Sequence, residues 1–450
     1  MDKLVIEGGH RLTGTIHVGG SKNTALPLMA AAVLADGVTK LHNMPVLRDV
    51  HTFANVLRVA GASVEYRPDE DPSTPDTMVV DASKIDHPEA PYDLVKQMRA
   101  SFYMLGALLG RSGRARVSLP GGCAWGPRPV DLHLDGMKAL GAEVDLDRGY
   151  VVARAQNGRL EGGRFEFGTV SVGATINVLL AAVMAKGTSV LENVAAEPDV
   201  VVFGEALQQM GAKIDGLGTR TLTVEGVDRL DPIDFWNCPD RIELGTYMIA
   251  AAMAGEPGST FEITGARADH LGADFPEAFR ATGADFSTRP EAEGPHEVVT
   301  VQVPETIEPV SISTDPYPGF ATDLQAQWTV LMTQAKGNSE VVDTIYTDRF
   351  KHIPELQRMG ANCIVVGNKV VIEGKGRDNL SGTTVMSTDL RASVSLVLAG
   401  MVADGTTDVL RVYHLDRGYE DLEGKLSKAG IAIRREEYQE RQVEEIPAGG

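Results

Sequence analysis

Cysteine, aromatic residues and positive charge are all scarce in this 450-residue chain. Its three cysteines, Cys123, Cys238 and Cys363, stand far apart, without a Cys-x-x-Cys pair or the Cys/His spacing of a zinc site. We therefore expect no disulfide framework, no metal and no bound cofactor, and a reduced compartment such as the cytoplasm. The net charge of −20 argues against broad binding to nucleic acid or to an anionic membrane. An anionic substrate would need a local cluster of Arg and Lys.

Long apolar runs are also absent. The longest, Thr24 to Ala35, is well short of the roughly 20 residues that span a bilayer, so we expect a buried core helix. Asp and Glu come too early in MDKLVIEGGHRLTG for the apolar region of a signal peptide. Residues 435–450, REEYQERQVEEIPAGG, are charged and poor in apolar side chains, which predicts a solvated or frayed tail.

What the chain does contain is an internal repeat. An apolar helical run, a short β-rich segment, an amphipathic helix ending in glycine and a strand recur six times, with the helix-ending glycines 70 to 80 residues apart. Each glycine stands where a helix needs a left-handed residue after its last turn. These glycines are Gly61, Gly141, Gly211, Gly283, Gly360 and Gly430.

A proline-containing segment divides the repeats into two sets of three. RLDPIDFWNCPDRIE carries Pro232 and Pro239, which interrupt regular structure and suit a crossover between halves. The sequence therefore predicts two similar α/β lobes of three units each. A ligand site is expected in the cleft between them.

Two glycine-rich stretches are candidates for chemistry. GGSKNTALP places Lys22 and Asn23 at a helix start, which is either a phosphate or sugar contact or merely a turn with an exposed lysine. LPGGCAWGPRPVDLH sets Cys123 in a glycine-rich loop five residues before Arg128. Such a setting lowers a thiol pKa and favours a reactive cysteine over an inert one, whereas Cys238 and Cys363 lack it.

Further basic residues are Arg99, Arg349, Arg391 and Arg417. Arg99 and Arg391 occupy equivalent places at the head of the first helix of their units, where helix amides also favour anions. The fifth unit holds Asp323 at this place, and Asp389 precedes Arg391 by two residues. Each aspartate is a helix N-cap by default, and near bound anions it could instead be a general base.

Taken together, the motifs resemble the enolpyruvyl transferase family, and within it the UDP-N-acetylglucosamine 1-carboxyvinyltransferases, over residues 1–434. The stretches that carry the resemblance are GGSKNTALP, MRAS, LPGGCAWGPRPVDLH, SVGAT, TDLQAQ, DRFKHIPEL, TDLRAS and YHLDRGYE. The resemblance implies an inside-out α/β barrel fold of two pseudo-threefold lobes with three repeated units each. It also implies a discontinuous C-terminal lobe, 1–21 plus 240–450, and an N-terminal lobe, 22–239.

The reaction that the resemblance implies is transfer of the enolpyruvyl group of phosphoenolpyruvate to the 3′-hydroxyl of UDP-N-acetylglucosamine, with release of phosphate. This is the first committed step toward peptidoglycan. Cys123 would be the general acid toward C3 of phosphoenolpyruvate, and Asp323 would take the sugar hydroxyl proton. The cations around the transferring group would be Lys22, Arg128 and Arg417.

The remaining implied site residues surround this core. Arg391 and Asp389 would belong to the same pocket, and Arg99 and Arg349 would be supporting cations. The nucleotide sugar would contact Asn23, the segment Arg128, Pro129, Val130, Asp131 and Leu132, then Ser171, Val172 and Gly173, and finally Ile345.

Three positions depart from the family pattern and leave another nucleotide or nucleotide sugar open as the acceptor. Thr169 and Thr347 stand where lysine and glutamate are usual, and Trp125 replaces a smaller side chain.

Enolpyruvylshikimate-phosphate synthase shares the implied fold but lacks the cysteine loop. RNA 3′-phosphate cyclase would call for a catalytic histidine and a surface suited to RNA, and a non-catalytic sensor predicts loss of the acid or the base.

Overall fold

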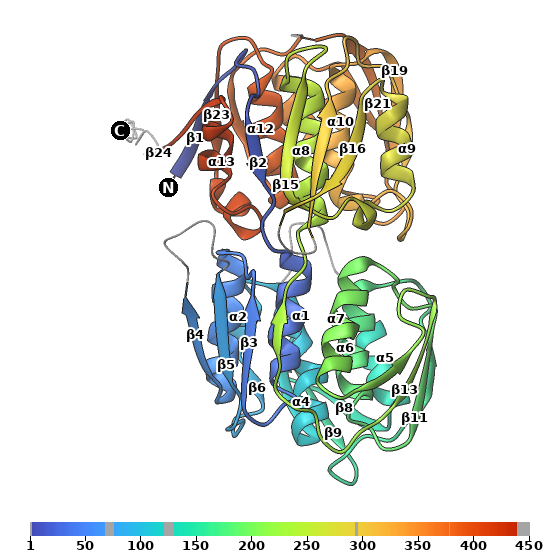
Figure 1. The fold of residues 1–450 in the computed structure, drawn as a ribbon. Helices are drawn as coiled ribbons and strands as arrows, with labels where there is room; N and C mark the ends of the chain where they lie inside the picture. Colours follow the sequence, from blue (N-terminus) through green and yellow to red (C-terminus); the bar gives the residue numbers. More distant parts are fainter. Residues whose placement is uncertain (1, 68–75, 121–129, 293–295, 378, 439–450) are drawn as a thin grey trace, which may run out of the picture.

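A computed structural model describes residues 2–67, 76–120, 130–292, 296–377 and 379–438. It forms two lobes, one above the other (Figure 1). Each lobe has its own hydrophobic core, the lower one drawn from residues 25–233 and the upper one from residues 4–18 and 242–433. None of the helices in the described ranges combines the length and the apolar character needed to cross a membrane.

The lower lobe contains three repeated units, with one strand of the first unit supplied from the end of the lobe. Unit 1 comprises α1 (Lys22–Ala32), β3 (Val38–His42), α2 (Arg48–Ala60), β4 (Ser63–Arg67), β5 (Thr77–Asp81) and β14 (Asp234–Trp236). Unit 2 comprises β6 (Glu89–Ala90), α3 (Tyr92–Val95), the 3₁₀ turn η1 (Arg99–Tyr103), α4 (Met104–Ser112), β7 (Arg114–Ser118), α5 (Asp131–Ala139), β8 (Ala142–Asp147) and β9 (Tyr150–Ala155). Unit 3 comprises β10 (Arg164–Glu166), α6 (Val172–Ala182), β11 (Thr188–Glu192), α7 (Pro198–Gln209), β12 (Lys213–Asp215) and β13 (Thr221–Glu225).

The upper lobe repeats this arrangement and takes two strands from the N-terminus. Unit 4 comprises β2 (Thr15–His17), α8 (Arg241–Ala254), β15 (Thr260–Ala266), η2 (Ala268–Leu271), α9 (Asp274–Ala281), β16 (Asp285–Pro290) and β17 (Glu297–Gln302). Unit 5 comprises β18 (Ile312–Ser313), η3 (Thr322–Leu324), α10 (Gln325–Thr333), β19 (Lys336–Val342), α11 (Ile353–Arg358), β20 (Cys363–Val366) and β21 (Lys369–Lys375). Unit 6 comprises β1 (Asp2–Glu7), β22 (Thr384–Met386), α12 (Leu390–Met401), β23 (Thr406–Leu410), η4 (Val412–Arg417), α13 (Leu422–Lys428) and β24 (Ala432–Glu437).

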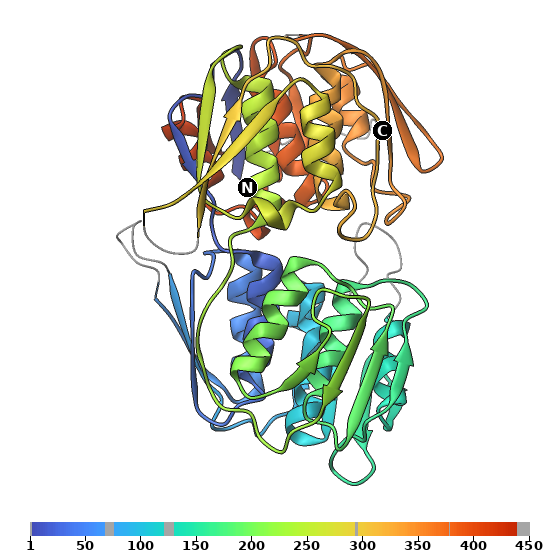
Figure 2. The same cartoon turned by 45° about the vertical axis from the view of Figure 1, so that its right-hand side comes forward.

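The strands of the described residues form six four-stranded sheets with one topology. In each sheet one edge strand is parallel to its neighbour and the other two pairings are antiparallel, as in β10-β11-β13-β12, where β10 is the parallel edge strand. The six predicted glycines all have positive φ, between 80° and 111°, so the six-fold repetition and its helix ends are confirmed. In Figure 2 the strands of the lower lobe lie outside its helices.

One apolar helix of each unit is buried in the centre of its lobe: α1, α4, α6, α8, α10 and α12. The predicted core helix is confirmed as α1, which is buried from Thr24 to Ala32. Small residues allow the central helices to approach closely: a Cβ on Gly106 of α4 would lie 2.0 Å from the carbonyl oxygen of Asn177 in α6. The N–H of Gly106 instead donates to Asn177 Oδ1 over 2.7 Å. A helix that is apolar all round is stable only in such a position.

Both chain ends contribute strands to the upper lobe. β1 lies between β23 and β24, and Figure 1 shows it in blue beside these red strands. The prediction of a frayed tail from residue 435 is wrong for residues 435–437, because they belong to β24 and pair with β1. Arg435 makes ion pairs with Asp416 and Glu423, which compensate its charge at this strand. Residues 439–450 lie outside the described residues.

Candidate active site

Two antiparallel segments, 18–21 and 237–240, link the lobes and carry the start of the site. Ser21 N donates to Cys238 O over 2.7 Å, and Asp240 N donates to Gly19 O over 2.9 Å. Gly20 is needed where the first segment passes the loop after β3, because its Cβ would lie 1.8 Å from Asn43 O. The second glycine before Lys22 therefore has a structural cause.

Lys22 follows directly as the first residue of α1. The Ser21 side chain caps this helix by accepting from Thr24 N, and Lys22 N donates to Asp240 Oδ2 over 3.2 Å. The alternative of an exposed turn lysine is wrong, since the Lys22 side chain is only 15% exposed and its Nζ lies 3.9 Å from Asp49 Oδ2. Burial lowers the pKa of the Lys22 ammonium, although Asp49 opposes the shift. A cation is thus fixed at the junction of the lobes.

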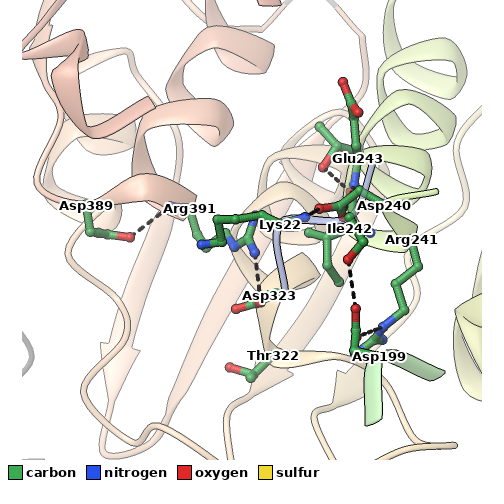
Figure 3. A network of polar contacts seen from close by, with 12 residues as sticks. Lys22, Asp199, Asp240, Arg241, Ile242, Glu243, Thr322, Asp323, Asp389 and Arg391 are labelled. Carbon is green, nitrogen blue, oxygen red and sulfur yellow. Dashed lines mark hydrogen bonds and ion pairs between the residues drawn. The ribbon is translucent and has the colours of Figure 1, made fainter. Parts of the chain in front are cut away.

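Asp323 lies between two buried guanidinium groups. Its Oδ2 is 2.8 Å from Arg391 Nη2 and its Oδ1 is 2.7 Å from Arg349 Nη2. Figure 3 shows Asp323 below Arg391, with Lys22 in the same group of side chains. Although burial acts in the opposite direction, Arg391 and then Arg349 hold the pKa of Asp323 well below its usual value. In this form the carboxylate is ionised and neutralises cations.

Asp389 has a different structural role from Asp323. Its Oδ1 accepts from the backbone N–H groups of Arg391, at 2.9 Å, and Ala392, at 3.2 Å, which makes it the N-cap of α12. The cap fixes the first turn of the helix and hence the place from which the Arg391 side chain starts. Of the two uses considered for this aspartate, the structure shows the cap.

Arg417 reaches from the upper lobe to the lower one. Its Nε lies 2.9 Å from Oδ1 of Asp49, a buried residue in the first turn of α2. Because Asp49 also faces Lys22, one carboxylate brings together a cation at the start of α1 and a cation of the upper lobe. Arg417, Asp49 and Lys22 therefore border the same site as Asp323.

The residues expected to contact a nucleotide sugar lie mainly at one end of the lower lobe. Val130 is the N-cap of α5 and is followed by the exposed Asp131 and the half-buried Leu132, while Ser171 caps α6 and precedes Val172 and Gly173. Arg99 begins η1, and both η1 and α5 pack against α6. The structure thus brings these three segments together. Cys123, Trp125, Arg128 and Pro129 lie outside the described residues.

Two further expected contact residues, Asn23 and Ile345, belong to other segments, and two of the positions that depart from the family pattern, Thr169 and Thr347, are also described. Asn23 is the second residue of α1 and is half-buried. Ile345 is exposed on the loop after β19, and Thr347 is exposed two residues later. Thr169 is exposed just before the Ser171 cap.

Sequence reasoning missed several acidic residues that hold the lobes together. Asp49 and Asp199 begin α2 and α7, the second helices of units 1 and 3, and each binds an arginine of the upper lobe. The partner of Asp199 is Arg241, at 3.0 Å, and Figure 3 shows this pair beside Lys22. Aligning the repeats would have placed both aspartates at one position, in VLRDV and AEPDV.

A third missed aspartate orders the loop that carries Ile345. Asp343 is fully buried and accepts from Ile345 N, Tyr346 N and the hydroxyls of Thr314 and Thr322. Thr322 is the neighbour of Asp323, so the loop and the carboxylate are tied to one anchor. Within the ranges that the structure describes, no group of three His, Cys, Asp or Glu side chains is placed to hold a metal ion.

Comparisons with known proteins agree with this arrangement. The family model of EPSP synthase (3-phosphoshikimate 1-carboxyvinyltransferase) matches residues 6–426. Proteins named UDP-N-acetylglucosamine 1-carboxyvinyltransferase from Chloroherpeton thalassium and Prosthecochloris aestuarii are 52% and 49% identical to this chain; the alignments cover 98% of it and 98% and 99% of those proteins.

Solved structures show the same fold. The enolpyruvyl transferase NikO from Streptomyces tendae superposes with a TM-score of 0.81 at 28% identity, covering 96% of this chain and 98% of NikO. An EPSP synthase from Acinetobacter baumannii has a TM-score of 0.73 at 17% identity, covering 97% of this chain and all of that one, and supports the fold alone. The chain belongs to the enolpyruvyl transferase family, among its UDP-N-acetylglucosamine 1-carboxyvinyltransferases.

Proposed function

We propose that this chain transfers the enolpyruvyl group of phosphoenolpyruvate to the 3′-hydroxyl of UDP-N-acetylglucosamine and releases phosphate, the first committed step toward peptidoglycan. The observation that carries the proposal is the group of cations around Asp323 and Asp49 where the lobes meet, in a chain about half identical to transferases of that name. A net charge of −20 makes such a local cluster of cations a specific feature.

Phosphoenolpyruvate would bind to these cations through its carboxylate and phosphate. Arg349 and Arg391 present planar guanidinium groups suited to carboxylate or phosphate oxygens, and Lys22 supplies a point charge from the start of α1. Arg417, which Asp49 holds, would add a further cation. Arg128, which lies outside the described residues, would supply another from the segment after Cys123. Their charge favours the anionic tetrahedral intermediate and the departing phosphate.

Asp323 would act as the general base. An arginine-bound carboxylate of depressed pKa is a weak base, so its hydrogen-bond partners must change first. When the substrate anion binds Arg391 and Arg349, these guanidiniums stabilise the Asp323 carboxylate less, and the pKa of Asp323 rises. The base is thereby strengthened only when phosphoenolpyruvate is bound.

The proposed reaction has two steps, an addition and an elimination. In the addition step, the 3′-oxygen bonds to C2 of phosphoenolpyruvate while Asp323 accepts the hydroxyl proton and Cys123 donates a proton to C3. In the elimination step, the Cys123 thiolate formed in the first step takes a proton from C3, and the bond between C2 and the phosphate oxygen breaks, which restores the double bond and frees phosphate. Cys123 could also add across the double bond of phosphoenolpyruvate, with sulfur bonding to C2 and the thiol proton passing to C3, to give a covalent phospholactoyl adduct.

The nucleotide sugar would lie against the lower lobe. The helix N-terminus of α6 at Ser171, Val172 and Gly173 offers N–H groups to an anionic diphosphate. The segment 128–132, Asn23 and Ile345 would surround the rest, with Arg99 as a supporting cation and Asp389 acting through the α12 cap.

The lobes would be two domains, 1–21 plus 240–450 and 22–239, each an inside-out α/β barrel with its sheets outside its helices. The two separate cores and the two short links support independent rigid movement. Binding of the nucleotide sugar would close the lobes around phosphoenolpyruvate.

The test is phosphate release from phosphoenolpyruvate by the purified protein with UDP-N-acetylglucosamine, with other nucleotides and nucleotide sugars, and with shikimate 3-phosphate. We expect release only with UDP-N-acetylglucosamine, together with the enolpyruvyl ether as the second product. Release with another nucleotide alone would assign a different acceptor, and the absence of release with every acceptor would refute the proposed function.

A further inference from the structure

A buried polar network meets Nη1 of Arg391, the nitrogen that does not bind Asp323. It consists of Tyr419, just after η4, Thr246 of α8 and Gln327 of α10, all of which are nearly or fully buried. The Tyr419 hydroxyl is 2.8 Å from Thr246 Oγ1 and 3.3 Å from Gln327 Nε2. Three segments far apart in the sequence thus meet at one phenol.

The direction of these hydrogen bonds follows from the available protons. Thr246 donates its hydroxyl proton to Ile242 O over 2.7 Å, so its oxygen must accept the proton of Tyr419. The oxygen of Tyr419 is then left to accept from Arg391 Nη1, at 3.5 Å. The Gln327 amide nitrogen is shared between this oxygen, at 3.3 Å, and Thr246 Oγ1, at 3.0 Å. Burial raises the pKa of Tyr419 to about 12, so the phenol keeps its proton at working pH.

Arg391 therefore has a fixed neighbour at each of its two terminal nitrogens, Tyr419 at Nη1 and Asp323 at Nη2. Nη1 faces the phenol oxygen and Nη2 binds Asp323, while the guanidinium carbon lies 5.9 Å from the centre of the Tyr419 ring. A guanidinium is planar, so fixing one nitrogen fixes the direction of the other. The same network reaches the base, because Gln327 Nε2 donates to the backbone oxygen of Asp323 over 3.0 Å.

We propose that Tyr419 is a positioning residue that aims the Arg391 guanidinium at phosphoenolpyruvate, with Thr246 fixing the direction of its hydroxyl. This inference rests on the proposed function, in which Arg391 binds the substrate anion. The phenol touches no reacting atom and acts through Arg391 alone.

The experiment compares Tyr419→Phe with the wild-type enzyme in steady-state kinetics for both substrates. Phenylalanine retains the ring and removes only the hydroxyl. We expect kcat/KM for phosphoenolpyruvate to fall about tenfold through a higher KM, equivalent to about 1.4 kcal/mol, while the KM for UDP-N-acetylglucosamine stays within twofold. The matched control is Tyr247→Phe, which removes another fully buried hydroxyl, bonded to Glu243 in the same lobe. It should lower Tm without changing the KM for phosphoenolpyruvate.

Thr246→Val provides a second variant, close in shape, that removes the acceptor of the Tyr419 proton. It should move the KM for phosphoenolpyruvate in the same direction, and it decides the question if Tyr419→Phe does not fold. Equal changes in both KM values, a change in kcat alone, or an unchanged KM for phosphoenolpyruvate in a folded variant would overturn the proposal. Wild-type turnover with UDP-N-acetylglucosamine is measured in the same assay, so failure of the proposed function would be recognised separately.

Discussion

Replacing Asp323 with alanine should weaken the fold and strengthen anion binding at the same time. The carboxylate is the shared partner of Arg391 and Arg349, which are 5% and 8% exposed. Removing one member of a buried ion pair costs about 3 to 5 kcal/mol, and the lower end applies because the Asp323 side chain is 25% exposed. For a lobe of this size, about 3 kcal/mol corresponds to a fall in Tm of about 6 to 12 °C.

An added anion should reverse much of this loss. In the wild-type protein, phosphate or phosphoenolpyruvate must compete with Asp323 for the two guanidiniums, whereas in Asp323→Ala it replaces the missing carboxylate. Phosphate at about 100 times its dissociation constant stabilises by about 2.7 kcal/mol. Turnover should nevertheless fall about 10²- to 10⁴-fold, because the general base is lost.

Thermal unfolding with increasing inorganic phosphate measures the first effect, and phosphate release from phosphoenolpyruvate measures the second. The control is Asp215→Ala, which removes an exposed carboxylate from β12 of the other lobe and changes the net charge equally. If phosphate raised the Tm of Asp323→Ala no more than that of the wild type, the two arginines would not form the anion site. Turnover within tenfold of the wild type would rule out Asp323 as the base.

Four other outcomes are expected. Burial, with a smaller effect of Arg99, lowers the pKa of His133 to about 3, so only the unfolded state gains this proton between pH 6.5 and about 3. The free energy of unfolding, measured with urea, should therefore fall by about 2 kcal/mol from pH 7 to pH 5, and this contribution should be missing in His133→Gln. An equal fall with pH in the wild type and the variant would contradict this. Asp49→Asn should lower kcat/KM for phosphoenolpyruvate about tenfold, since Arg417 loses a charged acceptor, and unchanged kinetics would refute the coupling. Peptide mapping after treatment with fosfomycin, a phosphoenolpyruvate-like epoxide, should find the label on Cys123 and none on Cys238. Burial raises the pKa of the Cys238 thiol to about 12, which leaves it unreactive. Labelling of Cys238 instead would argue against a reactive cysteine in the loop. Small-angle scattering should show a smaller radius of gyration with UDP-N-acetylglucosamine, and an identical profile would count against closure.

Much of the fold could be predicted because its signals are local. The left-handed glycines end their helices through backbone geometry at one position, so Gly61 and its five equivalents were visible in the sequence. The buried α1 was equally visible, since a short run of small apolar residues has no stable place at a surface. The resemblance in the motifs selected Asp323, Arg391, Arg349 and Lys22 for one site, and the structure brings them together.

The sequence by itself determined the repeating units, their helix ends and the residue types available for anion chemistry. Only the tertiary structure decided which charges meet, as with Arg417 and Asp49, which lie 368 residues apart. It also decided that Asp389 caps a helix while Asp323 binds two arginines, although both stand at helix starts. The physical reason is range: helix ends and periodicity depend on neighbouring residues, whereas an ion pair between lobes depends on how two separately packed cores are placed by two short links.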